Sequence, residues 1–156
     1  MLTPGGVGVL HSMMRIHETP VSPYIRRHIF PGCYVPSWRE VVSLLPEFDF
    51  HLLDMESLRR HYALTLERWV QRFEACRDQV RALGFDEQFI RMWRLYLHSC
   101  AASFRAGVLD LHQIVFTHGI NNELTLTRER LYAVDESAPE VQEEKPKGPP
   151  VSARTA

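Results

Sequence analysis

Two long segments with helical periodicity, separated by a short break, constrain the fold of this chain more than any other feature. Each carries large side chains spaced three or four positions apart, as on one face of an α-helix. The first segment, residues 58–83, has this stripe at Tyr62, Leu66, Trp69 and Phe73. The second, residues 87–105, has it at Phe89, Trp93, Tyr96, Cys100 and Phe104. Gly84 favours a helix end and Asp86 a helix start, so the sequence predicts two helices.

Three shorter segments are predicted to be strands. Residues 7–10 form an apolar run after the turn signal Pro4-Gly5-Gly6, and residues 48–55 alternate apolar and polar side chains. The third, residues 109–117, follows a helix end at Gly107. Because the first strand opens close to Met1, we expect its outer edge to be exposed unless another segment covers it.

The connection between the first two strands contains a short helix. Pro36-Ser37 favours its start and Pro46 its end. Residues 13–35, before it, are predicted to be irregular, with one helical turn near residues 24–28. Strands and helices together predict an α/β fold.

At 156 residues and 45% hydrophobic content, the chain has room for one domain with a core. We expect this domain over residues 1–133 and a disordered tail over 134–156, which lacks aromatic side chains. A formal net charge of −1 with scattered basic residues disfavours nucleic-acid binding. Two interpretations of Arg26-Arg27 and Arg59-Arg60 stay open, namely contacts with anionic lipid headgroups or solvated helix ends.

The cysteine pattern indicates a reducing compartment. Cys33, Cys76 and Cys100 show no CxxC spacing and leave one cysteine over, which argues against a disulfide framework and a zinc site. The histidines are dispersed, so no metal is expected. Apolar runs are too short to span a bilayer, and the N-terminus lacks the apolar stretch of a signal peptide. We therefore expect a cytoplasmic protein whose membrane contact, at the inner face, is peripheral.

Several short motifs occur together in a consistent order: Ile29-Phe30-Pro31-Gly32, the run from His61 to Trp69, Arg91-Met92-Trp93, the run from Cys100 to Arg105, and Gln113. In this order they resemble the C-terminal half of the cyclopropane-fatty-acyl-phospholipid synthases. These enzymes add a methylene from S-adenosylmethionine across the cis double bond of a phospholipid acyl chain. The resemblance implies the C-terminal part of a class I, Rossmann-like methyltransferase sheet with a helical insertion, whose N-terminal strands are missing.

The resemblance also implies site residues. His11, in Leu10-His11-Ser12 at the end of the first predicted strand, matches a family histidine that helps to hold a bicarbonate ion, the proposed base. Tyr62, in Tyr-x-x-Thr-Leu-x-x-Trp, matches a tyrosine that binds this ion and faces the developing cation. Cys100, in the motif running from Arg91 to Phe104, matches a neighbour of the ion. The alternatives from the residues alone are a structural histidine, a packed tyrosine and a buried thiol.

The acyl chain is expected to contact aromatic side chains. The candidates for this channel are Phe30, Trp93, Tyr96 and Phe104, and the same stripe equally suits a packed core. Trp69 is expected in the core. Cys33 stands where relatives have a small residue, and it would be strained if that position needs a positive φ.

The glycine-rich loop that binds S-adenosylmethionine in the family has no match here, so no cofactor-binding residue is assigned. We therefore expect a synthase fragment that is inactive alone and that needs the missing N-terminal half, or a second copy of itself, as partner. Two rival functions stay open: a related methyltransferase acting on another lipid, and a non-catalytic lipid-binding module.

Overall fold

The computed structural model describes residues 2–128 and 132 of the chain. All the helices and strands below lie within the compact unit Met1–Asn122. The predicted tail, residues 134–156, lies outside the described residues.

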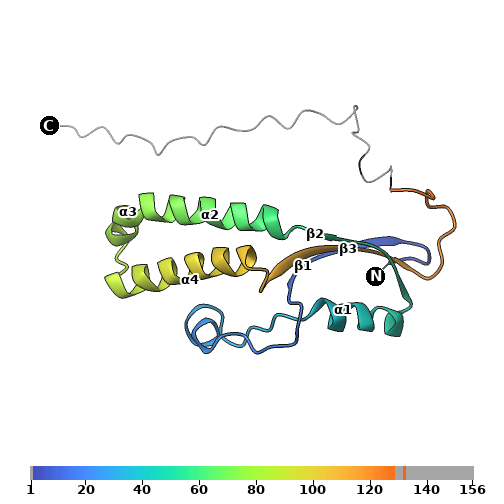
Figure 1. The fold of residues 1–156 in the computed structure, drawn as a ribbon, viewed down its shortest axis with the longest axis horizontal. Coiled ribbons are helices and arrows are strands. Elements are labelled where there is room, and N and C mark those ends of the chain that lie inside the picture. Colours follow the sequence, from blue (N-terminus) through green and yellow to red (C-terminus); the bar gives the residue numbers. More distant parts are fainter. Residues whose placement is uncertain (1, 129–131, 133–156) are drawn as a thin grey trace. The chain divides into compact units, whose positions relative to one another are not determined.

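A three-stranded antiparallel sheet organises this unit (Figure 1). Its strands are β1 (Val7–Met14), β2 (Phe50–Ser57) and β3 (Asp110–His118), in the order β1-β3-β2. The last strand of the sequence is thus the central one, and it runs antiparallel to both neighbours. Strand β1 has no strand partner on its outer side among residues 2–128.

Within residues 2–128, four α-helices connect the strands. They are α1 (Trp38–Leu44), α2 (Arg59–Ala75), α3 (Arg77–Ala82) and α4 (Glu87–Arg105). A one-turn π-helix, η1 (Ile25–Ile29), and a short 3₁₀ turn, η2 (Pro46–Phe48), precede β2. In Figure 1, α2 and α4 lie side by side beyond one end of the sheet. None of the helices in the described part is long and apolar enough to cross a bilayer.

Local sequence signals fix most helix ends where they were predicted. Ser37 caps α1 through a capping box, since its Oγ accepts the N–H of Glu40 and the Glu40 carboxylate accepts the N–H of Ser37. Asp86 caps α4 by accepting the N–H of Phe89 at 2.8 Å. Gly84 and Gly107 follow the ends of α3 and α4 with φ of 91° and 74°, values that favour glycine.

The single helix predicted over residues 58–83 is instead two helices, α2 and α3. The chain leaves helical geometry at Cys76, whose φ and ψ are −100° and 7°. Its N–H bonds to the carbonyls of both Arg72 and Phe73, which tightens the last turn of α2. The Arg77 guanidinium donates to the Glu74 carbonyl, an acceptor that the ended helix leaves free.

The predicted strand over residues 48–55 begins later, at Phe50. Phe48 belongs to the 3₁₀ turn, and Asp49 takes a left-handed conformation with φ of 56°. A register shift between Leu52 and Asp54 then interrupts the alternation. Of the three apolar residues expected to face inward, only Phe50 is partly buried, while Phe48 and Leu52 are exposed.

Two other local expectations are corrected. Strand β1 continues past residue 10 to Met14, because its ladder with β3 extends as far as the pair Met14 and Asp110. Cys33 is not in the left-handed region, since the positive φ in this segment, 75°, belongs to Gly32. Cys33 therefore carries no backbone strain of that kind.

The core consists of two clusters on opposite faces of the sheet. One joins α2, α4 and β3 and contains Ala63, Leu66, Ala101, Phe104 and Leu111. The other joins the sheet to the residues around α1 and contains Met14, Leu45 and Ile114. Since Leu111 and Ile114 are three apart on β3, their side chains point to opposite faces. The α2–α4 pair thus packs on one face of the sheet near the start of β3, where Leu111 lies, and the residues around α1 pack on the other face.

Candidate functional site

Aromatic side chains from two distant segments meet on α4. The ring of Phe30, just after η1, is edge-on to that of Tyr96, with centroids 5.7 Å apart. Trp93 is edge-on to Tyr96 at 5.4 Å. Phe30 remains 47% exposed, so this cluster reaches the surface. The structure therefore brings together three of the four residues predicted to contact the acyl chain.

The segment bearing Phe30 is anchored to α4 by hydrogen bonds. The Tyr24 hydroxyl donates to the carbonyl of Met92 at 2.6 Å. The N–H of Phe30 donates to the Ile25 carbonyl at 2.9 Å and closes the π-helical turn. These contacts hold Phe30 against Tyr96 although 66 positions separate them in the sequence.

A second group, continuous with the first, lies where α2 and α4 face each other. The ring of Tyr62 is edge-on to Phe104, with centroids 4.8 Å apart. The Cys100 thiol lies close enough to Tyr62 and to Tyr96 to raise the pKa of both phenols. Tyr62, Tyr96 and Cys100 are all partly buried. We call Phe30, Tyr62, Trp93, Tyr96 and Cys100 the aromatic–thiol cluster.

Burial keeps the polar groups of this cluster neutral. It raises the pKa of Tyr62, and the nearby Cys100 adds to this effect. It raises the pKa of Tyr96 well above the usual range and that of the Cys100 thiol as well. The two phenols are therefore hydrogen-bond donors at neutral pH, and Cys100 is a thiol. A nucleophilic cysteine needs a lowered pKa, so this environment does not favour Cys100 as a nucleophile.

His11 lies within β1, and not at the end of a strand as predicted. It pairs with Gln113 on β3, and the Gln113 side-chain nitrogen lies 3.1 Å from His11 Nδ1. Gln113 follows Leu111 by two positions, so both side chains point to the face of the sheet that meets Phe104. Among the described residues, no hydrogen bond or ring contact joins His11 to the aromatic–thiol cluster. The two share one face of the sheet.

Two of the predicted aromatic residues differ sharply in burial. Phe104 is only 1% exposed and belongs to the core, where its ring contacts that of Tyr62. Trp69 was expected in the core but is 43% exposed, with its ring edge-on to Tyr62 at 6.1 Å. Trp69 does lie on the predicted apolar face of α2. That face extends past the end of the sheet, so Trp69 is left partly exposed there.

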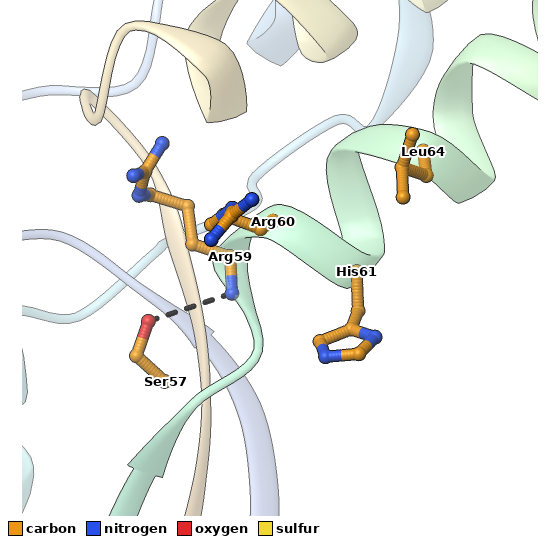
Figure 2. Close-up of a pocket in the computed structure, with 5 residues that line it drawn as sticks. All are labelled: Ser57, Arg59, Arg60, His61 and Leu64. Carbon is orange, nitrogen blue, oxygen red and sulfur yellow. Dashed lines mark hydrogen bonds between the residues drawn. The ribbon is translucent and has the colours of Figure 1, made fainter.

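A cleft at the start of α2 was not predicted as a site. Figure 2 shows its lining residues, which are Ser57, Arg59, Arg60, His61 and Leu64. The Arg59 guanidinium donates to the carbonyls of Phe104 at 2.7 Å and Arg105 at 3.1 Å, so it caps the C-terminus of α4. The only hint of this cleft in the sequence was the basic pair Arg59-Arg60. The pair does not reveal that β2 joins α2 at this point, and this junction forms the cleft.

The described residues do not fit an S-adenosylmethionine site. Such cofactors are received by a glycine-rich turn from a strand into a helix. The direct strand-to-helix turn here, from β2 into α2, runs Ser57-Leu58-Arg59, contains no glycine and opens on two arginines. Nor do residues 2–128 and 132 hold a group of three His, Cys, Asp or Glu side chains suited to a metal ion.

Comparison with known proteins finds clear relatives. A family model described as mycolic acid cyclopropane synthetase matches residues 1–114. The chain is 37% identical over 119 residues to tuberculostearic acid methyltransferase UfaA1 of Mycobacterium tuberculosis, covering 72% of this chain and 28% of that protein. It is 34% identical over 128 residues to the cyclopropane-fatty-acyl-phospholipid synthase of Escherichia coli, covering 81% of this chain and 33% of the synthase. It thus spans about a third of the length of these relatives.

Comparison with solved structures finds relatives of the same kind. The fold is similar to that of mycolic acid cyclopropane synthase CmaA1 complexed with SAH and CTAB, with a TM-score of 0.67 and 30% identity. The match covers 74% of this chain and 45% of that one. The structures it resembles are class I methyltransferases, which confirms the predicted α/β fold class.

Proposed function

Because the chain belongs to the mycolic acid cyclopropane synthetase family, we propose that it carries part of the lipid site of an enzyme that modifies unsaturated acyl chains. The reaction is methylene transfer from S-adenosylmethionine to the cis double bond of a phospholipid acyl chain. The observation that carries this proposal is the aromatic–thiol cluster, in which residues of η1, α2 and α4 meet.

The rings of Phe30, Trp93 and Tyr96 are the proposed contacts of the acyl chain. They are apolar and meet edge-on, so ring faces remain free beside them. Such faces stabilise a cation, and attack of the alkene on a methyl donor leaves positive charge on the acyl chain. The half-exposed Phe30 gives the lipid a route from the surface to Tyr96.

His11 and Tyr62 are the proposed holders of a bicarbonate ion. Ring closure requires the loss of one proton from the added methyl group, and bicarbonate can accept it as carbonic acid. A neutral phenol and an imidazole N–H are suitable donors to this anion. Support comes from the raised pKa of Tyr62 and from the sheet face shared by His11 and the aromatic–thiol cluster. Cys100 is the proposed thiol neighbour.

We further propose that this chain depends on a partner for the methyl donor. Its residues do not fit S-adenosylmethionine, so the cofactor-binding part must come from a separate part of the family's fold, supplied by a further segment or by an oligomer. On this proposal, the 156-residue chain alone neither binds S-adenosylmethionine nor transfers methylene.

The proposed lipid source is a phospholipid bilayer, met peripherally at the cytoplasmic face. Arg26 and Arg27 are exposed on η1, four and three positions before the half-exposed Phe30. Basic residues near an aromatic side chain suit an anionic membrane surface. Charge reversal of both arginines should reduce binding of the chain to anionic phospholipid vesicles at low salt. Unchanged binding would remove this surface from the proposal.

A second candidate is methyl transfer without ring closure. It is favoured by the 37% identity to a tuberculostearic acid methyltransferase. The two reactions give isomeric acyl chains that differ in which proton is lost, so gas chromatography separates them.

A segment exchange tests the proposed function. The 128 matched residues of the Escherichia coli synthase are replaced by their counterparts from this chain, and cellular lipids are analysed for cyclopropane and branched acyl chains. We expect methylene transfer well above that of the synthase lacking the segment. An exchanged enzyme that folds and binds S-adenosylmethionine but modifies no lipid would instead indicate a non-catalytic lipid-binding module.

A further inference from the structure

Gln113 faces His11 across the β1–β3 ladder in a geometry that specifies a proton position. The two residues are paired in register, and the Gln113 side-chain nitrogen lies 3.1 Å from His11 Nδ1. A side-chain amide nitrogen donates hydrogen bonds and does not accept them. His11 Nδ1 must then be the acceptor, which leaves the proton of the neutral imidazole on Nε2.

We infer that Gln113 is a positioning residue that holds His11 in the Nε2–H tautomer, so that the outer nitrogen of the ring is a hydrogen-bond donor. This tautomer is the one that a histidine needs in order to donate to an oxyanion through Nε2. The use of this N–H for bicarbonate rests on the proposed function. The tautomer itself rests only on the contact between the two side chains.

The position of Gln113 in the sheet suits this role. It lies on the central strand, paired on both sides, so its backbone is held by two ladders. Its partner on β2 is Glu56, which completes a row of three residues across the sheet. Strands are about 4.8 Å apart, so Gln113 keeps the Glu56 backbone roughly 10 Å from that of His11. The residue adjacent to the imidazole in this row is therefore a neutral amide.

A neutral amide and a carboxylate at position 113 would favour opposite tautomers of the His11 ring. A carboxylate at position 113 can only accept, so it would draw the proton to Nδ1. The Gln113→Glu variant changes one terminal group and little volume. It is therefore a sharper test than removal of the side chain, and Gln113→Leu serves as the variant that removes the polar contact.

The test is nitrogen NMR of the full 156-residue chain with labelled histidine. Long-range proton–nitrogen spectra distinguish a protonated from an unprotonated ring nitrogen, and a His11→Gln variant identifies the His11 signals. We expect Nε2 protonated and Nδ1 unprotonated in the original chain, a reversed pattern in Gln113→Glu, and a mixture of tautomers in Gln113→Leu. Gln79→Glu on α3 is the matched control and should leave the His11 signals unchanged.

Two results would overturn the inference. One is a protonated Nδ1 in the original chain, which would mean that the Gln113 amide is turned and accepts through its oxygen. The other is an unchanged pattern in both Gln113 variants while the backbone signals of β1 and β3 keep their positions, which shows that the ladder is intact.

A second measurement separates this inference from the proposed function. In the exchanged enzyme, Gln113→Leu should lower kcat while the KM for S-adenosylmethionine stays the same. Gln113→Asn should have a similarly low kcat, because its shorter side chain does not bring the amide to His11. If the NMR pattern is as expected but turnover is unaffected, the tautomer assignment holds and the catalytic role of His11 fails.

Discussion

Cys100 illustrates how the environment of one residue determines its chemistry. It lies between Tyr62 and Tyr96 on the inner face of α4, where burial raises the pKa of its thiol. The thiolate is the reactive form of cysteine, so a raised pKa delays its appearance as pH rises. Burial therefore keeps Cys100 as a neutral thiol and makes it a poor nucleophile.

Alkylation measures this directly. In a Cys33→Ser, Cys76→Ser background, the rate of Cys100 alkylation should rise with a midpoint above 9.0, the ordinary thiol value. The matched chain that keeps only Cys76 provides the comparison. Fast alkylation of Cys100 near neutral pH would contradict the buried, neutral thiol.

Phe104 and Trp69 are two aromatic residues of the predicted helical stripes with different burial. Phe104 is 1% exposed in the core, whereas Trp69 is 43% exposed. Phe104→Ala should cost about 3–5 kcal/mol, because it leaves a cavity between α2, α4 and β3. Trp69→Ala should cost roughly 1–2 kcal/mol, because much less area leaves water. Urea unfolding of both variants checks the order, and equal losses would contradict the observed packing.

At the scale of elements, the segment before α1 is held to its capping serine by charge. The Ser37 hydroxyl donates to Glu18 at 2.7 Å, and Arg39 forms an ion pair with the same carboxylate. The Arg39 contact, followed by the Ser37 contact, lowers the pKa of Glu18 to about 2. Glu18 thus links residues before α1 to its first turn.

This arrangement predicts a pH dependence. A carboxylate with a lowered folded-state pKa stabilises the fold above its ordinary value of 4.5, and the effect is lost as pH falls toward about 2. The original chain should therefore lose more unfolding free energy than Glu18→Gln between these pH values. Because the pair is partly exposed, salt should reduce the difference. Glu47→Gln, on an exposed turn, is the control. If the unfolding free energy of Glu18→Gln and of the original chain fell equally at acid pH, the prediction would be contradicted.

The sequence predicted those elements whose signals are local. Asp86 and Gly107 set both ends of α4 at the predicted residues, and Ser37 set the start of α1. The break at Cys76 carries no proline or glycine, so periodicity alone ran through it. The bulge in β2 was likewise invisible, because it depends on pairing with β3.

For the site, the sequence predicted candidate residues but not how they would be arranged. The resemblance named the residues of the aromatic–thiol cluster and His11, and the structure brings the cluster together. The contacts of Phe30 with Tyr96 and of Gln113 with His11 depend on how distant segments pair. No pattern within one segment carries that information, so neither the central place of β3 nor the contact of Gln113 with His11 could be derived from the sequence.

At the scale of the whole molecule, the outer side of β1 dominates the expected behaviour. Val9 and Met13 on this strand are 61% and 40% exposed, and the strand has no partner on that side among residues 2–128. Unpaired strand edges with apolar side chains promote association between chains. We therefore expect the isolated chain to self-associate through β1.

Sedimentation velocity measures this association. Val9→Lys should shift the chain toward monomer, because a lysine on an edge strand opposes pairing of like edges. Val108→Lys, at another exposed valine in the turn after α4, is the matched control and should leave association unchanged. A sharp monomer for the original chain at high concentration would contradict the prediction and favour an independent module.

The turnover of Tyr62→Phe in the exchanged enzyme tests the central claim most directly. The change removes one hydroxyl and keeps the ring that packs edge-on against Phe104. Loss of one donor from a preorganised site lowers turnover about a hundredfold, or about 3 kcal/mol. We predict this loss of methylene transfer with unchanged binding of S-adenosylmethionine and unchanged stability. Full turnover in Tyr62→Phe would contradict the account and leave Tyr62 as a packing residue between α2 and α4.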